Sequence, residues 1–256
     1  MFRILLADDE KMVLLSTEKT FPFSRYGMKV AARTSDSFHA LQLLKESEFD
    51  AALLDIRMPG LSGIDIISEC RRQKIATEFI VISGYSDFAY MKQAIQFGAF
   101  DYCLKPVKQE EANELSQRLS ELLFQKRIAQ DSLRLAEILS HKNILPDLVR
   151  LGFPATLHEL TVLRIALTSV REILLLFPED ETSPLFLHSY FFLLSETTAL
   201  LLADVPNQNA EPLINAVLSL PNARLTAGTT DCSKGHLNRL TAQLATDLLL
   251  TTQEQP

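Results

Sequence analysis

Short apolar runs alternate with longer amphipathic segments along the first 120 residues of the chain. Five runs are rich in Ile, Leu, Val, Ala or Phe and meet polar residues at their ends, at residues 2–8, 28–33, 50–55, 78–83 and 100–105. Between them, apolar residues recur at helical spacing. Strand and helix signals that alternate in this way predict a parallel sheet with helices on both faces.

Residues that begin and end helices stand between these runs. Ser35 or Asp36 can cap a helix that reaches about residue 46, and Ser62 can start a helix that ends near residue 72. Pro22 and Gly27 interrupt the chain before the second run. The turns therefore separate strand–helix units of similar length, which supports the alternating pattern.

Polar side chains gather where the predicted strands end: Asp8, Asp9, Asp55, Ser83 and Lys105. In parallel sheets, sites form at the carboxyl ends of the strands. Adjacent acids repel each other and resist burial unless a cation neutralises them. A solvated loop would explain the acids alone, whereas Asp55 and Lys105 at neighbouring strand ends favour a Mg²⁺ site, because Mg²⁺ binds a few carboxylates, water and a phosphate oxygen.

Four motifs follow one another along this region: ADDE at residues 7–10, LLDIRMPGLSG at 53–63, VISGYSD at 81–87 and GAFDYCLKPV at 98–107. In this order and spacing they resemble the receiver domain of two-component response regulators. The resemblance covers residues 1–121. It implies a flavodoxin-like α/β fold, with a doubly wound parallel five-stranded sheet in the order 2-1-3-4-5.

The resemblance implies roles for the acidic residues. Asp55 is the expected phosphoacceptor, which receives a phosphoryl group from a sensor histidine kinase. Asp8, Asp9 and Asp55 are expected to bind Mg²⁺, and the backbone carbonyl of Arg57 is expected as a further ligand. An aspartate is ordinarily ionised at neutral pH, so it can act as a nucleophile without a general base.

The resemblance also implies roles for three residues on the last two strands. Lys105 is expected to pair with the phosphoryl oxygens, and its bond to Pro106 is expected to be cis. Ser83 is expected to close on the phosphoryl group. Ser83 and Tyr102 are the expected switch residues, although an aromatic residue in a strand also serves as core packing.

A long helix is predicted over residues 109–141, where neither Gly nor Pro occurs. One apolar stripe runs through Leu115, Leu119, Leu122, Ala129, Leu133 and Ala136, and a second runs through Phe124, Ile128, Leu135 and Ile138. Neither stripe is a regular heptad pattern. The helix either packs on its own domains or joins the receiver to an output domain and helps to form a homodimer.

The remaining sequence predicts a smaller α+β domain. The divisions are a receiver domain at residues 1–121, a helical linker at 122–142 and a middle domain at 143–256. Apolar patterns in the last part predict the order β-α-β-β-α-β-α, with a final helix capped by Ser233. This order is ferredoxin-like.

The middle domain resembles the degenerate, nucleotide-cyclase-like domain of some AraC-type response regulators. A working cyclase of that kind carries glycines and two acids at its central hairpin. Here the hairpin reads LLSETTAL, with one acid and no glycine. We therefore expect no enzymatic activity.

DNA binding is not expected of this chain. Residues 143–256 carry 12 Asp and Glu against 6 Lys and Arg, which opposes contact with phosphates. AraC-type regulators usually end in two helix-turn-helix motifs, and none is recognisable here. Either the chain is a truncated transcriptional regulator that contacts DNA through a domain absent from it, or it acts alone through protein–protein contact.

Composition narrows the class of protein further. The net charge is −7, so general attraction to nucleic acid or anionic membranes is not expected. No apolar run is long enough to span a bilayer, and the N-terminus does not read as a signal peptide. The three cysteines lack metal-ligand spacing, so we expect reduced thiols in a cytoplasmic protein.

Two other functional classes compete with the phosphoacceptor. Many aspartyl-nucleophile phosphatases carry a second Asp two residues after the nucleophile, and here Arg57 stands at that position. A pseudo-receiver that only binds proteins would not need the full set of acids, hydroxyl and lysine. The sequence favours the phosphoacceptor over both.

Overall fold

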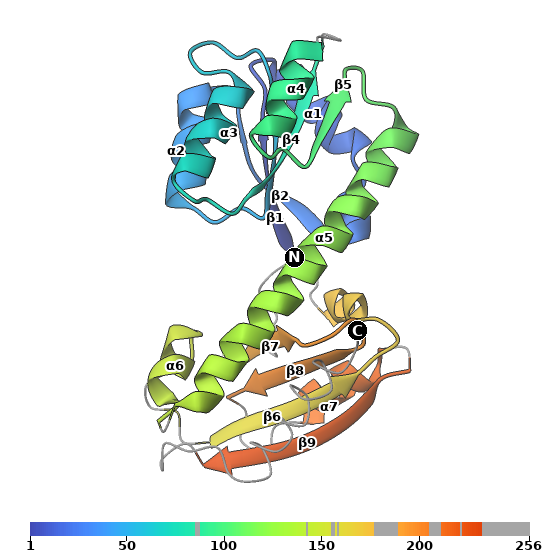
Figure 1. The fold of residues 1–256 in the computed structure, drawn as a ribbon. Helices are drawn as coiled ribbons and strands as arrows, with labels where there is room; N and C mark the ends of the chain where they lie inside the picture. The colour runs from blue at the N-terminus through green and yellow to red at the C-terminus, as the bar shows by residue number, and fades with distance from the viewer. Residues whose placement is uncertain are drawn as a thin grey trace. The chain divides into compact units, whose positions relative to one another are not determined.

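The computed structural model describes residues 1–84, 88–141, 143–154, 157, 159–176, 189–204, 211–220 and 222–231. The chain divides into two compact units, Met1–Leu123 and Phe124–Pro256. The helix α5 (Gln109–Ser140) begins in the first unit and ends in the second (Figure 1). The predicted boundaries at residues 121 and 142 stay a prediction.

The first unit is a parallel sheet with helices packed on it. Its strands are β1 (Phe2–Ala7), β2 (Met28–Thr34), β3 (Ala51–Asp55), β4 (Glu78–Ser83) and β5 (Asp101–Leu104). They lie in the order β2-β1-β3-β4-β5, and every neighbouring pair is parallel (Figure 1). The predicted flavodoxin-like sheet is confirmed. The helical elements are α1 (Lys11–Thr20), η1 (Ser24–Tyr26), α2 (Ser37–Glu46), α3 (Gly63–Arg72), α4 (Phe88–Gln96) and the first half of α5.

Side-chain caps fix the starts of two helices. The Asp36 carboxylate accepts a hydrogen bond from the His39 N–H at 2.9 Å, so Asp36 caps α2. At α3, the Ser62 hydroxyl accepts from the Asp65 N–H, and the Asp65 carboxylate accepts from the Ser62 N–H. This reciprocal pair is a capping box. Both helices begin where the sequence predicts.

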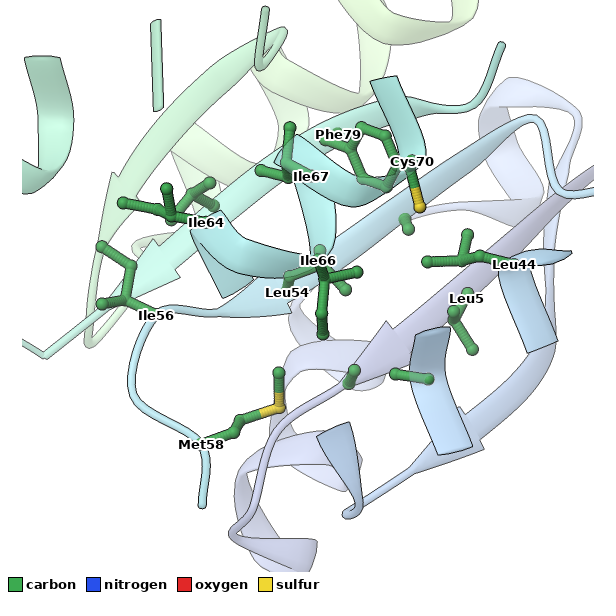
Figure 2. Packing of buried hydrophobic residues seen from close by; sticks show 14 of the residues in the cluster. Leu5, Leu44, Leu54, Ile56, Met58, Ile64, Ile66, Ile67, Cys70 and Phe79 are labelled. Atoms are coloured by element: carbon green, nitrogen blue, oxygen red, sulfur yellow. The ribbon is translucent and has the colours of Figure 1, made fainter. Parts of the chain in front are cut away.

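The sheet is buried on both faces. On one face, residues from β1, β3 and β4 form a cluster with α2, α3 and α4. Figure 2 shows Leu5 beside Leu44, and Leu54 beside Ile66. Residues that alternate with these along the strands, such as Leu53 and Ile80, are also buried. Because successive side chains of a strand point to opposite faces, the second face is covered as well.

The second unit contains an antiparallel sheet. Its strands are β6 (Glu159–Ala166), β7 (Ser189–Leu193), β8 (Thr198–Ala203) and β9 (Arg224–Asp231). They lie in the order β7-β8-β6-β9, with antiparallel neighbours (Figure 1). The helical elements are the second half of α5, α6 (Leu145–Arg150), η2 (Val170–Leu176) and α7 (Glu211–Leu218). The predicted smaller α+β domain after a long helix is confirmed.

Two local predictions for the second unit have different outcomes. The sequence predicts that Pro146 breaks the helical region, because proline cannot continue a helix. The long helix α5 ends at Ser140, and Pro146 lies in the first turn of α6, where its missing N–H is not needed. The helical region is therefore interrupted shortly before Pro146, and the proline itself belongs to the start of the next helix. The final helix predicted from Ser233 lies outside the described residues.

The burial of the two apolar stripes changes along α5. Phe124, Leu135 and Ile138 of the second stripe are buried, and the last two belong to the core of the second unit. In the first stripe, Leu115 and Leu119 are buried, whereas Leu133, in the C-terminal half of the helix, is 73% exposed. The C-terminal half of α5 therefore packs on its own unit through the second stripe. None of the helices among the residues that the structure describes is long and apolar enough to cross a membrane.

Candidate phosphoacceptor site

The predicted site residues lie at one edge of the parallel sheet. Asp8 directly follows β1, Asp55 is the last residue of β3, Ser83 is the last residue of β4, and Lys105 directly follows β5. Because all these strands are parallel, their carboxyl ends share an edge. β1 and β3 are neighbours although β2 lies between them in sequence, so Asp8 and Asp55 flank the point where the strand order reverses.

One ammonium group joins the two buried carboxylates. The Lys105 Nζ donates to Asp8 Oδ2 at 2.6 Å and to Asp55 Oδ1 at 2.5 Å. Asp8 is 5% exposed and Asp55 is 6% exposed. The structure therefore brings together three of the predicted residues, which come from the ends of three strands.

Backbone N–H groups hold the other carboxylate oxygens. The Glu10 N–H donates to Asp8 Oδ1 at 3.1 Å, and the Arg57 N–H donates to Asp55 Oδ2 at 2.6 Å. Each carboxylate is thus fixed from two sides. A fixed orientation matters for a nucleophile, because it restricts the direction in which the oxygen can attack.

Burial and pairing act in opposite directions on these groups. Burial raises the pKa of Asp8, and the hydrogen bonds from Lys105 and Glu10 offset only part of that effect. Burial alone would lower the pKa of Lys105, but its hydrogen bonds to Asp55 and Asp8 together outweigh burial and raise it. Lys105 is therefore held as a cation at neutral pH.

The charges around Lys105 fit a hard divalent cation. Two buried carboxylates share one ammonium group, so the cluster keeps a net negative charge. Asp9 is exposed beside it. The described parts of the chain contain no preformed group of three or more His, Cys, Asp or Glu side chains that could hold a metal. Carboxylate oxygens are nevertheless the ligands that Mg²⁺ prefers, and the complete set of Asp8, Asp9, Asp55 and the Arg57 carbonyl stays a prediction.

Ser83 and Tyr102 lie on the strands next to the acids. Ile82 is paired with Asp55 across β3 and β4, so Ser83 is one position further toward the edge. Ser83 is 1% exposed, and its carbonyl accepts from the Lys105 N–H at 2.7 Å. Tyr102 is paired with Val81 and packs against the hydrophobic cluster of the sheet. Their switch roles stay a prediction.

Two further features of the loops are informative. The peptide bond between Lys105 and Pro106 is cis, as predicted. The guanidinium of Arg57 lies 5.6 Å from the centre of the Tyr90 ring on α4. This contact links the loop after Asp55 to α4. The sequence contains no signal for it, because it depends on where α4 packs.

Comparison with known families identifies the first unit. The family model of the response regulator receiver domain matches residues 4–118. These residues are a response regulator receiver domain. The predicted resemblance is confirmed for this part of the chain, and the match includes Asp8, Asp55, Ser83 and Lys105.

Curated relatives of the receiver domain are regulatory proteins. The transcriptional regulatory protein HptR of Staphylococcus aureus is 29% identical over 127 residues, which is 50% of this chain and 50% of that protein. An uncharacterized response regulatory protein of Staphylococcus epidermidis is 29% identical over 126 residues, or 49% of each chain. The chain thus spans about half the length of the curated relatives that it matches.

Among solved structures, the receiver domain of AraT, a response regulator from Geobacillus stearothermophilus, is 28% identical. The match covers 49% of this chain and 97% of that chain, with a TM-score of 0.46.

Proposed function

We propose that the receiver domain accepts a phosphoryl group on Asp55 from a sensor histidine kinase. The geometry of the Asp55 carboxylate carries this proposal. The carboxylate ends a buried strand at the sheet edge and is held by the Lys105 ammonium group and the Arg57 N–H. Family membership of residues 4–118 supports the same role.

The chemistry requires a nucleophile and compensation for negative charge. A carboxylate oxygen of Asp55 attacks the phosphorus, an O–P bond forms, and the N–P bond to the donor histidine breaks. The product is an acyl phosphate. Lys105 moves from pairing two carboxylates to pairing the new phosphoryl oxygens, and it does so as a cation because its pKa is raised. Mg²⁺, when bound, supplies further positive charge at the acids and the phosphoryl group.

The first prediction tests the nucleophile. Treatment of the full chain with acetyl phosphate and Mg²⁺ should add one phosphate, and Asp55→Asn should reduce the modification to background because the nucleophilic oxygen is lost. Intact-mass and peptide mass spectrometry measure both. Asp50→Asn is the matched control, since Asp50 lies at the opposite end of the same strand and accepts from the Arg3 N–H. Equal modification of wild type and Asp55→Asn would reject Asp55 as the site.

We propose that the signal leaves the site through Ser83 and Tyr102. In this proposal, Ser83 moves toward the phosphoryl group, and Tyr102 repacks on the hydrophobic cluster. The outcome would be a shift in the population of homodimers, with α5 as the linking helix. The contact of Arg57 with Tyr90 supports a response of α4 to events at Asp55.

We propose that the second unit is a noncatalytic, cyclase-like middle domain of an AraC-type regulator. The turn between β7 and β8 supports the noncatalytic part of this proposal. Its backbone donors are used internally: the Leu194 and Ser195 N–H groups donate to the Thr198 carbonyl, and the Thr197 N–H donates to the Ser195 hydroxyl at 3.2 Å. Donors that are already paired are poor partners for a triphosphate.

The second prediction concerns this unit. The chain should convert no GTP to a cyclic dinucleotide and should show no salt-sensitive DNA binding, because the turn lacks glycine and the unit is acidic. Nucleotide analysis by chromatography and a low-salt DNA shift assay measure these outcomes. Contact with DNA would then depend on a domain outside this chain, or the protein would act through protein–protein contact. GTP turnover would overturn the noncatalytic assignment. A cytoplasmic location stays a prediction.

A further inference from the structure

Ser37, at the start of α2, contacts the loop that follows the phosphoacceptor. Its side chain is buried, with 1% of the residue exposed. The Ser37 hydroxyl donates to the Pro59 carbonyl at 2.5 Å and accepts from the Leu61 N–H at 3.0 Å. One hydroxyl group thus uses its donor and an acceptor site on two backbone groups of the same loop.

Ser37 is not needed to cap its own helix. Asp36 caps α2 through the His39 N–H, and the Asp36 N–H is itself held by the Thr34 hydroxyl at 3.1 Å. The position of the first turn of α2 is therefore set by its neighbours. The Ser37 side chain can therefore form hydrogen bonds with the loop at residues 57–61, which lies more than 20 residues away in sequence.

The loop lies tightly against this turn of α2. Gly60 has a φ of +91°, which favours glycine, and a Cβ at that position would be 2.4 Å from Cε2 of Phe38. The same Cβ would be 3.1 Å from the Ser37 hydroxyl oxygen. The left-handed backbone at Gly60 and the two hydrogen bonds of Ser37 therefore fix the tip of the loop at one place.

The base of the loop is fixed to the site itself. The Arg57 N–H donates to Asp55 Oδ2, and the Gly63 N–H donates to the Ile56 carbonyl at 3.1 Å. Ile56 and Met58, on either side of Arg57, are buried in the hydrophobic cluster (Figure 2). Only a short stretch separates this base from Pro59, so the position of the tip constrains the backbone of Arg57.

We propose that Ser37 is a positioning residue for the magnesium and phosphoacceptor site. Its hydroxyl holds residues 57–61 in the shape that presents the Arg57 N–H to Asp55 and the Arg57 carbonyl to the metal. This inference rests on the proposed function of Asp55. It assigns no direct contact of Ser37 with the phosphoryl group.

Ser37→Ala tests the inference in the full chain. We expect the dissociation constant for Mg²⁺, measured by calorimetry on the unphosphorylated protein, to rise about tenfold, as for other residues that orient metal ligands. The Mg²⁺ concentration for half-maximal phosphorylation by acetyl phosphate should rise in parallel, while the rate at saturating Mg²⁺ changes less.

Ser120→Ala is the matched control. Ser120 is also a buried serine of the first unit, and its hydroxyl donates to the Tyr26 carbonyl at 2.9 Å, away from the acids. Its removal should cost similar stability without changing Mg²⁺ affinity. Gly60→Ala, which strains the loop backbone at a φ of +91°, should reproduce the Ser37→Ala shift and keeps the inference testable if Ser37→Ala does not fold.

The outcomes separate the inference from the proposed function. If wild type binds Mg²⁺ and is phosphorylated, but Ser37→Ala and Gly60→Ala match Ser120→Ala in Mg²⁺ affinity, Ser37 is not a positioning residue. If wild type itself neither binds Mg²⁺ nor accepts phosphate, the proposed function fails first, and this inference fails with it.

Discussion

Each of the two units buries carboxylate groups next to a cation. In the receiver domain, Asp8 and Asp55 share Lys105. In the second unit, Asp131 on α5 is 2% exposed, and both of its oxygens accept from the Nε of Arg127, at 3.0 and 2.9 Å. Burial raises the pKa of Asp8 and also that of Asp131. Burial and a perturbed pKa therefore do not distinguish a functional site from a structural one here.

Charge balance and location do distinguish the receiver cluster (Asp8, Asp55 and Lys105) from the second cluster (Asp131 and Arg127). Asp131 has a cation of its own, and its Oδ2 also accepts from the Leu193 N–H of β7 at 2.9 Å. β7 is an edge strand of its sheet, so Asp131 pairs an N–H that the sheet leaves open. In the receiver domain, two acids at strand ends share one cation. The receiver cluster keeps a net negative charge and can bind a cation. The second cluster is neutral, and it completes the fold by supplying an acceptor for the edge strand.

The largest expected difference between the clusters is in their effect on the phosphorylation of Asp55. Asp8→Asn should lower Mg²⁺-dependent phosphorylation of Asp55 on the order of 100-fold, because it removes a charged metal ligand from a site that depends on electrostatics. The fold should persist, since the substitution also relieves repulsion between two acids. Phosphorylation rates at several Mg²⁺ concentrations and circular dichroism measure the two effects.

Asp131→Asn is the control for that experiment. It removes a buried negative charge from the second unit and should leave phosphorylation unchanged. If both variants lowered phosphorylation equally, or if Asp8→Asn kept the Mg²⁺ dependence of wild type, the distinction between the two clusters would be lost.

The next largest expected effect is on stability. Asp131→Ala should destabilise the second unit by about 2 kcal/mol, because the buried N–H of Leu193 loses its acceptor. Urea unfolding measures the loss, and hydrogen exchange should show faster exchange at the Leu193 amide. Asp131→Asn keeps an acceptor for that N–H and should lose less. Equal stability of wild type and Asp131→Ala would mean that this cluster does not complete the fold.

The receiver site was largely predictable from sequence. Parallel strands share their carboxyl edge, so residues at strand ends must meet once the alternation of strand and helix is recognised. The strand pattern alone therefore predicts that Asp8, Asp55 and Lys105 lie together. The lengths of the strands and the caps at Asp36 and Ser62 follow from equally local signals.

Other features were not predictable, because they depend on contacts between distant segments. Asp131 occupies a long helix in which an acid normally faces solvent, and its partner Leu193 is 62 residues away. Ser37 follows a good cap residue, so nothing in the sequence assigns its hydroxyl to a loop. Pro146 reads equally well as a helix end or a helix start. In each case, tertiary packing selects among options that local rules leave open.

The smallest expected effect is the pH dependence of the second cluster. Burial raises the pKa of Asp131 above its ordinary 3.8, against the opposing charge of Arg127 and the Leu193 N–H. The folded protein therefore holds this proton more tightly than the unfolded chain does. The resulting stabilisation is fully present below pH 3.8 and is lost as the pH rises through the folded pKa.

Wild type should consequently gain stability relative to Asp131→Asn as the pH falls from 7 toward 4, since asparagine does not titrate. Urea midpoints of both proteins across this range measure the difference, and titrating groups that do not interact with Asp131 cancel in the comparison. A constant difference would mean that Arg127 fully offsets burial. If wild type instead lost stability relative to Asp131→Asn as the pH falls, the ion pair with Arg127 would stabilise the charged form of Asp131 by more than burial destabilises it.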